Sequence, residues 1–138
     1  MSTRGCFGYY KDGVSKLCFN RWDSYPKGLG QSFVDFLVAE GIDTFVASFS
    51  FKEEDDATEF IKDSIFCEWA YVANIDSGKL EIYEGFQKQK SENRYQPPEP
   101  IRAGYWGPKL IAEIPFESLK EGFETFSLEL AVTRDTEP

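Results

Sequence analysis

Histidine is absent from this chain of 138 residues, and methionine occurs only once, at position 1. Without imidazole, the sequence excludes Ser-His-Asp and Cys-His nucleophilic pairs, zinc sites built on histidine and histidine general bases. An enzyme of this composition would have to act through carboxylates, lysine, tyrosine, cysteine or an N-terminal nucleophile. Thr3 is the candidate for that last role, since removal of Met1 and Ser2 would expose its amine; an ordinary strand residue is the alternative interpretation.

Long apolar runs are also absent. No stretch of 18 residues is apolar throughout, so the sequence predicts no transmembrane helix. The first residues lack the hydrophobic segment of a signal peptide. These absences predict a cytoplasmic protein with no membrane partner.

Cysteine is scarce, and the spacing of Cys6, Cys18 and Cys67 matches no metal-binding motif. Cys6 and Cys18 fall on the two arms of a predicted hairpin, where a disulfide is geometrically conceivable. Reduced, buried thiols are the favoured interpretation for a cytosolic chain. The sequence predicts neither a metal nor a cofactor.

Positive charge is deficient, and the deficiency lies in one part of the chain. The net charge is −9. Residues 1–50 hold five basic and five acidic residues, whereas residues 51–138 hold ten basic and nineteen acidic residues. A nucleic-acid-binding protein needs a basic patch, so this balance argues against direct nucleic-acid binding. It is compatible with an acidic contact surface for a protein partner, with mimicry of nucleic acid, or with solubility alone.

The chain contains enough apolar and aromatic residues to form the core of a single α+β domain over residues 1–138. Hydrophobic residues make up 41% and aromatic residues 17% of the chain, which predicts a core built on rings. Two hairpins are predicted, at residues 3–19 around Asp12-Gly13 and at residues 67–86 around residues 76–79. Glycines at positions 5 and 8 indicate a bulge, or close approach of another backbone or a ligand, within the first strand.

Helical spacing predicts a helix over residues 30–40, because Leu29, Phe33, Phe36 and Leu37 recur on one face and Gly41 follows as a C-cap. A second helix of about three turns is predicted over residues 57–65.

Three other segments complete the expectation. Residues 109–114 predict a strand that Pro115 ends, with Leu110, Ala112 and Ile114 on one face. Residues 42–51 and 116–132 remain open between helix and strand. Residues 87–104 predict a long loop that is functional or mobile. The expected fold is an antiparallel sheet built from two hairpins plus further strands, with the first hairpin central and two or three helices on one face.

The segment at residues 20–30 is the densest candidate site. The segment combines polar and basic side chains, two aromatic rings and glycines. Together with Arg4 it gives the candidate ligand-binding residues: Arg4, Asn20, Arg21, Trp22, Asp23, Ser24, Tyr25, Lys27, Gly28 and Gly30. Amides at a helix N-terminus bind anions, so a phosphate-bearing small molecule fits this corner. A structural turn, in which the polar side chains bond only the backbone, is an equally weighted alternative.

An acidic run supplies the candidate partner-binding residues Glu53, Glu54, Asp55, Asp56 and Glu59. A divalent cation would need six to eight oxygens around a turn with glycine at the bend, and this run has neither glycine nor alternating spacing. A solvated helix start is the favoured structural interpretation, because acidic residues favour the positive end of the helix dipole.

Thr3-Arg4-Gly5 and the corner from Phe19 to Gly30 together resemble a family of uncharacterised small proteins encoded by bacteriophages and bacteria. That family has Thr-Arg-Gly near its start and then a Tyr-Asn-His-Phe-Asp-Ser-Tyr-Pro type of corner ending in Leu-Gly. Similar segments lie at residues 68–72, 80–87 and 109–112, so the resemblance extends from Thr3 to about Leu119. Arg21 stands where the family has histidine, and any role of an imidazole there is lost. The resemblance implies a phage or prophage setting and carries over no activity.

These observations predict a small acidic, non-enzymatic, phage-type binding protein that occupies a host or defence protein in the host-cell cytoplasm. The acidic part of the chain supplies the expected contact surface. One alternative is a pocket protein that sequesters a small nucleotide or phosphorylated ligand at the corner. Another is a hydrolase that uses carboxylates or an N-terminal nucleophile. The sequence defines no oligomeric state.

Overall fold

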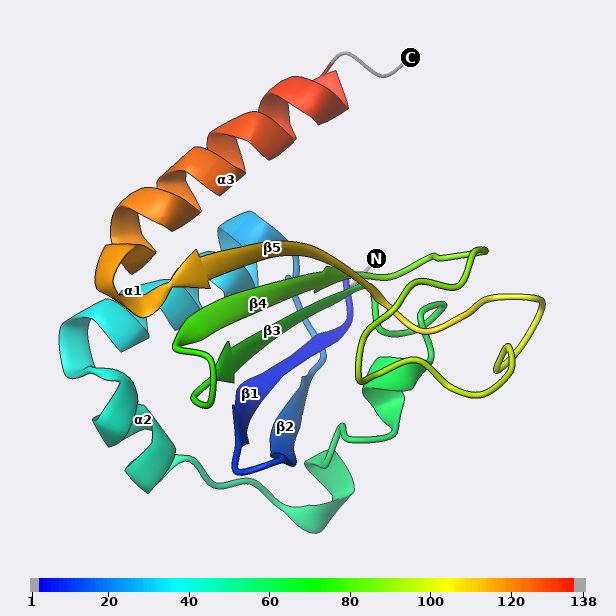
Figure 1. The fold of residues 1–138 in the computed structure, drawn as a ribbon, viewed down its shortest axis with the longest axis horizontal. Helices are drawn as coiled ribbons and strands as arrows, with labels where there is room; N and C mark the ends of the chain where they lie inside the picture. Colours follow the sequence, from blue (N-terminus) through cyan, green and yellow to red (C-terminus); the bar gives the residue numbers. More distant parts are fainter. Residues whose placement is uncertain (1–2, 136–138) are drawn as a thin grey trace.

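A computed structural model describes residues 3–135 as one five-stranded sheet with three α-helices, an α+β fold (Figure 1). The strands are β1 (Gly5–Lys11), β2 (Val14–Asn20), β3 (Trp69–Asn74), β4 (Lys79–Glu84) and β5 (Lys109–Pro115). The helices are α1 (Gln31–Glu40), α2 (Ile42–Ser48) and α3 (Leu119–Asp135). The predicted hairpins, the helix over residues 30–40 and the strand over residues 109–114 are confirmed.

The strand order is β2-β1-β3-β4-β5, which corrects the expected sheet in two ways. The pairing of β1 with β3 is parallel, while the other neighbours are antiparallel. The first hairpin is not central, because β2 is an edge strand and β3 occupies the middle. A parallel pair requires a long crossover, and the chain supplies one between β2 and β3 that contains α1 and α2.

All three α-helices contribute to a single apolar core on one face of the sheet, as expected. Its buried helical members are Phe33, Val34, Leu37, Phe45, Leu119 and Phe123. Gly41 ends α1 with φ of 92° and donates its N–H to the Leu37 carbonyl, which confirms the predicted C-cap. The segments left open by the sequence are largely helical: α2 occupies residues 42–48, and a 3-10 turn at Phe116–Ser118 leads into α3.

The opposite face of the sheet is covered by irregular chain and short 3-10 turns instead of α-helices. Its buried apolar cluster includes Leu17, Ile61, Tyr83 and Tyr95. The predicted three-turn helix over residues 57–65 is wrong, because only Phe60–Lys62 forms a 3-10 turn there.

Backbone hydrogen bonds explain the missing helix. The Ala57 N–H donates to the Leu17 carbonyl of β2, so this segment begins by pairing with the edge of the sheet. The carboxylates of Asp56 and Asp63 accept hydrogen bonds from the N–H groups two residues on, at Thr58 and Ile65. Such local side-chain bonds compete with helix formation.

Two expected apolar faces are also corrected. Phe33 is 4% exposed and Leu37 is buried, but Phe36 is 41% exposed, so Phe36 is not part of the packed face of α1. In β5 a register shift places Leu110 in the cluster opposite the helices, whereas Ala112 and Ile114 pack with the helices. One extra residue in a strand reverses the alternation of its faces.

The three thiols are free, and the first two lie on different faces of the sheet. Cys6 belongs to the cluster opposite the helices, with its Sγ 3.9 Å from that of Cys67. Cys18 pairs across the hairpin with Phe7, whose ring packs on the helical side. A bridge between Cys6 and Cys18 is therefore excluded by the alternation of side chains along the strands.

Close backbone approach accounts for the glycines of β1, as the sequence indicated. A Cβ on Gly5 would overlap the Trp69 carbonyl oxygen, and one on Gly8 would overlap the Lys16 carbonyl oxygen.

Candidate functional site

The corner at residues 20–30 uses its polar side chains to fasten itself to the sheet. The Asn20 side-chain amide donates to the Trp22 carbonyl at 2.6 Å and to the Ser24 hydroxyl at 2.8 Å. Ser24 is fully buried, and its backbone N–H donates to the Thr3 carbonyl. The Tyr71 hydroxyl, from the central strand, donates to the Ser24 carbonyl at 2.8 Å. These bonds give Asn20 and Ser24 a structural role.

The glycines of the corner allow close packing. A Cβ on Gly28 would overlap the Asp23 carbonyl oxygen, while the next residue, Leu29, donates its N–H to the same oxygen at 2.8 Å. A Cβ on Gly30 would lie 2.9 Å from the Tyr71 ring and 3.1 Å from the Phe123 ring. The tight entry into α1 therefore needs glycine at both positions.

The cations proposed for a phosphate ligand each have a different neighbour. The Arg4 guanidinium lies 4.6 Å from the centre of the Phe66 ring. The Arg21 guanidinium lies over the Phe19 ring and 3.6 Å from the Asp55 carboxylate. Lys27 is exposed. The phosphate-ligand hypothesis stays a prediction; these neighbours give no common anion site.

Two aromatic rings of the corner are exposed: Trp22 is 68% exposed and Tyr25 is 41% exposed. Asp23 is exposed as well and has φ of 51°. The corner thus presents two rings to solvent while its amide and hydroxyl groups are occupied.

An apolar pocket of about 350 Å³ adjoins the corner, where α1 and α2 lie over the first hairpin. We call it the aromatic pocket, and its lining residues are Phe7, Cys18, Leu29, Ser32, Phe33, Phe36, Phe45, Ser48, Phe49 and Ser50. Most of its ring contacts are edge to face, as between Phe33 and Phe45, whose centres are 4.9 Å apart. Apolar walls with a few polar groups are typical of binding sites for ligands or partner side chains.

The acidic run borders this pocket. A neighbouring hollow of about 450 Å³ shares Phe49 and Ser50 with the aromatic pocket and is also lined by Asp56 and Thr58. Glu53, Glu54 and Glu59 are exposed. The run forms a 3-10 turn, Glu53–Asp55, and not the start of a longer helix. The structure therefore places Asp56, one of the five predicted partner-binding residues, in a hollow next to the aromatic pocket.

Two charged groups of this border are held in place by local bonds. The hydroxyl and the N–H of Thr58 donate to the Asp56 carboxylate and lower its pKa. Asp55 faces Arg21 at the corner. These contacts connect the corner, the acidic run and the pocket into one surface region.

Cys18 is the one lining residue with a thiol. Burial, followed by the nearby Asp55 carboxylate, raises the pKa of this thiol, and Arg21 offsets the increase only in part. The thiolate is the nucleophilic form of cysteine. The raised pKa therefore argues against a catalytic role for Cys18.

Sequence reasoning identified Leu29 and Phe33 as core residues, which the structure confirms. It also predicted the acidic run as a contact surface, which stays a prediction, and it missed the aromatic pocket. Phe45 and Phe49 lie in the segment that the sequence left open. The helical spacing of Phe45 and Phe49 was the available signal. The gap left between five phenylalanine rings depends on how α1 and α2 cross the sheet.

A second group of polar side chains, also missed, surrounds Glu81 on the face opposite the α-helices. Asn74, Tyr83 and Arg94 all bond the Glu81 carboxylate. Burial alone would raise the pKa of Glu81, but the bonds from Arg94, Asn74 and Tyr83 outweigh it and hold the pKa below its usual value. The glutamate within the apolar strand sequence Leu80 to Tyr83 was the only sequence signal for this cluster.

Within residues 3–135, no three histidine, cysteine, aspartate or glutamate side chains lie close enough to hold a metal ion. None of the helices in the same range has the length and hydropathy needed to cross a membrane.

No protein-family model matches the chain, and no curated protein or solved structure matches it.

Proposed function

We propose that this chain is a non-enzymatic binding protein of phage type, which occupies a host or defence protein. The aromatic pocket receives apolar side chains of the partner, and the acidic run beside it meets basic residues of the same partner. The observation that carries this proposal is the continuity of the apolar pocket with the acidic border through Phe49 and Ser50.

The size and composition of the region support a protein partner. The pocket volume of about 350 Å³ lies near the lower end of the range for ligand sites. Partly exposed rings at its edge, such as Phe36, provide the kind of anchor that dominates protein interfaces. Charges at the rim of an interface mainly accelerate association and select partners of opposite sign.

The chemistry of the pocket supports binding without catalysis. Its polar lining groups are three serines and the Cys18 thiol, whose pKa is raised. No histidine exists to activate any of them. A nucleophile needs an adjacent base or a lowered pKa, and this pocket supplies neither to its thiol.

Filling the pocket tests the proposal. Ser32 is exposed on α1 and lines the pocket, so Ser32→Trp places an indole at its mouth. Ala39 is exposed on the same helix outside the lining, so Ala39→Trp is the matched control. We expect affinity capture from a bacterial lysate, followed by mass spectrometry, to recover a partner with wild type and Ala39→Trp but not with Ser32→Trp. Equal recovery by both variants, or no retention above that of an unrelated acidic protein, would contradict the proposal.

The acidic border has its own test. Glu53, Glu54 and Glu59 are exposed, so changing all three to Gln removes charge without disturbing the bonds of Asp55 and Asp56. We expect the association rate with the recovered partner to fall and its dependence on salt to weaken. An unchanged rate and salt dependence would restrict the contact to the pocket. Changing Glu117, Glu121 and Glu124 near the start of α3 to Gln is the control with equal charge loss.

A further inference from the structure

Glu81 is a buried carboxylate that the sheet surrounds with donors. It lies on β4, is 3% exposed and faces away from the α-helices. The Asn74 amide donates to its Oε2 at 3.0 Å, and the Tyr83 hydroxyl donates to its Oε1 at 2.8 Å. Both donors lie on strands of the sheet, Asn74 on β3 and Tyr83 on β4, so the carboxylate is held in one orientation.

Arg94 binds the Glu81 carboxylate in a bidentate manner. Its Nη1 donates to Oε1 of Glu81 at 2.5 Å, and its Nη2 donates to Oε2 at 2.9 Å. The guanidinium also lies 3.9 Å from the centre of the Tyr10 ring and 5.3 Å from that of Tyr95. A planar fork that bonds a carboxylate and stacks on rings is specific to guanidinium; an ammonium group cannot reproduce it.

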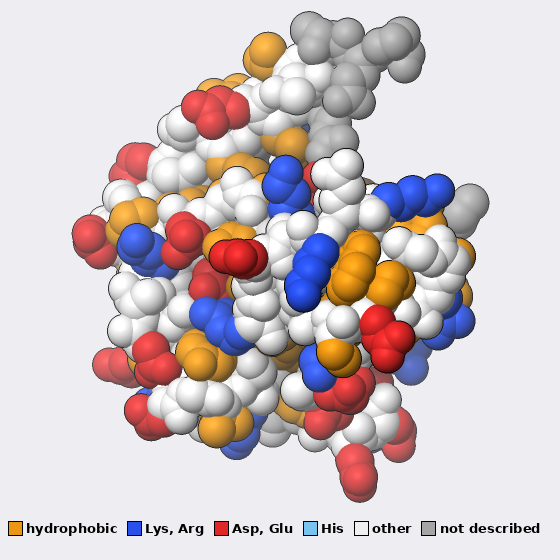
Figure 2. All heavy atoms as spheres, turned by 45° about the vertical axis from the view of Figure 1, so that its right-hand side comes forward, with side chains coloured by type: hydrophobic (Ala, Val, Ile, Leu, Met, Phe, Trp, Pro, Cys, Tyr) orange, Lys and Arg blue, Asp and Glu red, His pale blue; other side chains and the backbone are white. Residues whose placement is uncertain are grey.

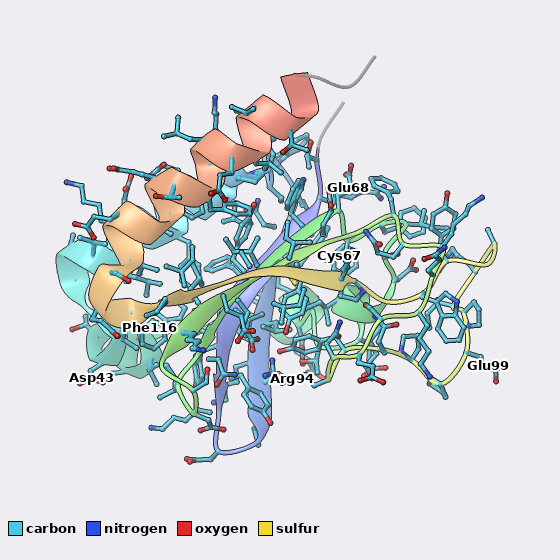
Figure 3. The ribbon with its side chains drawn as sticks, turned by 45° about the horizontal axis from the view of Figure 1, so that its top comes forward. Asp43, Cys67, Glu68, Arg94, Glu99 and Phe116 are labelled. Carbon is cyan, nitrogen blue, oxygen red and sulfur yellow. The ribbon has the colours of Figure 1, made fainter. Side chains whose placement is uncertain are left out.

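Arg94 and the side chains that contact it belong to different parts of the fold. Tyr10, Asn74, Glu81 and Tyr83 lie on β1, β3 and β4, whereas Arg94 comes from residues 85–108, which contain no strand of the sheet and no α-helix. In Figure 3, Arg94 lies over the strands, while Glu99 of the same segment lies far from them. The Arg94 side chain is 28% exposed, so the site can be reached from solvent.

We propose that the pocket formed by Glu81, Asn74, Tyr83 and Tyr10 is a guanidinium-binding site, which the chain fills with its own Arg94. The same pocket accepts an arginine side chain or a small guanidinium compound from outside when Arg94 is withdrawn. The ligand class is a planar monocation with at least two N–H groups on one edge. This site is separate from the aromatic pocket and lies on the other face of the sheet, so it does not depend on the function proposed above.

Chemical rescue of Arg94→Ala tests the assignment. The variant leaves the buried Glu81 without its cation, and its melting temperature falls below that of wild type. Millimolar methylguanidinium is expected to raise the melting temperature of Arg94→Ala in a saturable manner, as binding to the folded state requires. Methylammonium at the same concentration is expected to give no saturable increase, because it carries equal charge without the fork.

The double variant Arg94→Ala/Glu81→Gln is the matched control, since it keeps the vacated space but removes the carboxylate. We expect it not to respond to methylguanidinium. If Arg94→Ala does not fold alone, recovery of its near-ultraviolet circular dichroism on addition of methylguanidinium is the equivalent measurement. Failure of methylguanidinium to restore either property, or an equal effect of methylammonium, would overturn the assignment.

Discussion

Phe33 and Phe36 lie three positions apart on α1, yet Phe33 is 4% exposed and Phe36 is 41% exposed. Both rings line the aromatic pocket, but Phe33 also contacts Phe7 and Phe45 inside the core, whereas Phe36 is the more exposed of the two. Phe33→Ala should lower the free energy of unfolding by about 3–5 kcal/mol, as for other buried rings. Phe36→Ala should cost much less. Urea unfolding of the two variants measures the difference, and equal losses would contradict the assigned burial.

Glu81 makes the free energy of unfolding depend on pH in the acidic range. Its pKa is held below the usual value, so the ionised carboxylate stabilises the folded state fully above the unfolded-state pKa of about 4.3. That contribution is lost as the pH falls through the lower pKa of the folded state. The difference in unfolding free energy between wild type and Glu81→Gln should therefore shrink below about pH 4.3. Urea titrations between neutral and acidic pH measure it, and a constant difference would contradict the assignment.

At the scale of elements, local signals were sufficient where the chain turns back on itself. Asp12-Gly13 and the turn at residues 76–79 specify hairpins whose strands are neighbours in sequence. The parallel pairing of β1 with β3 was not predictable in the same way. These two strands are joined by a long crossover, so no turn motif between them marks the pairing in the sequence. The central place of β3 follows from that pairing.

The C-terminal helix illustrates a different difficulty. The first half of α3 packs on the core through Leu119, Phe123 and the partly buried Phe126, while Leu128 and Val132 are more than 60% exposed. In Figure 1 this later part of α3 extends beyond the sheet. Leu128 and Val132 do not lie on the buried face of the helix. The spacing of apolar residues in residues 127–132 therefore fits a strand or a frayed end as readily as a helix.

Hydrogen exchange should separate the elements by their position in the sheet. The amides of β3 lie between β1 and β4, and five of its six residues are buried. Residues 87–104 contain no strand of the sheet and are largely exposed around positions 98–104. We expect β3 amides to exchange most slowly and those near residues 98–104 among the fastest. Comparable protection in both segments would contradict the described core.

At the scale of the whole molecule, the chain carries a net charge of −9. Figure 2 shows the side that carries residues 87–108, where acidic and basic side chains are interspersed. Net charge alone therefore does not locate a contact surface. The acidic run acquires a specific neighbour only because residues 49–57 pass along the edge of β2 and place Asp56 beside the aromatic pocket.

How much of the candidate site could be predicted follows from the same geometry. The sequence indicated the acidic run and the helix that carries Phe33, since both are local patterns. It could not indicate that Phe7, Phe33 and Phe45 leave a hollow between them, because these rings come from three separate elements. The corner was correctly singled out as dense in polar groups, but their partners, such as Tyr71 for Ser24, lie far away in sequence.

Alkylation of Cys18 tests most directly whether the aromatic pocket is the contact site. Cys18 lines the pocket and is partly accessible, whereas Cys6 and Cys67 are no more than 1% exposed, so N-ethylmaleimide should modify Cys18 first. Mass spectrometry gives the rate of modification for the free protein and for its complex with the recovered partner. We expect the partner to slow modification of Cys18 strongly in wild type and in Ala39→Trp. An unchanged rate in a saturated complex would contradict the central claim, because it would show that the partner leaves the pocket open.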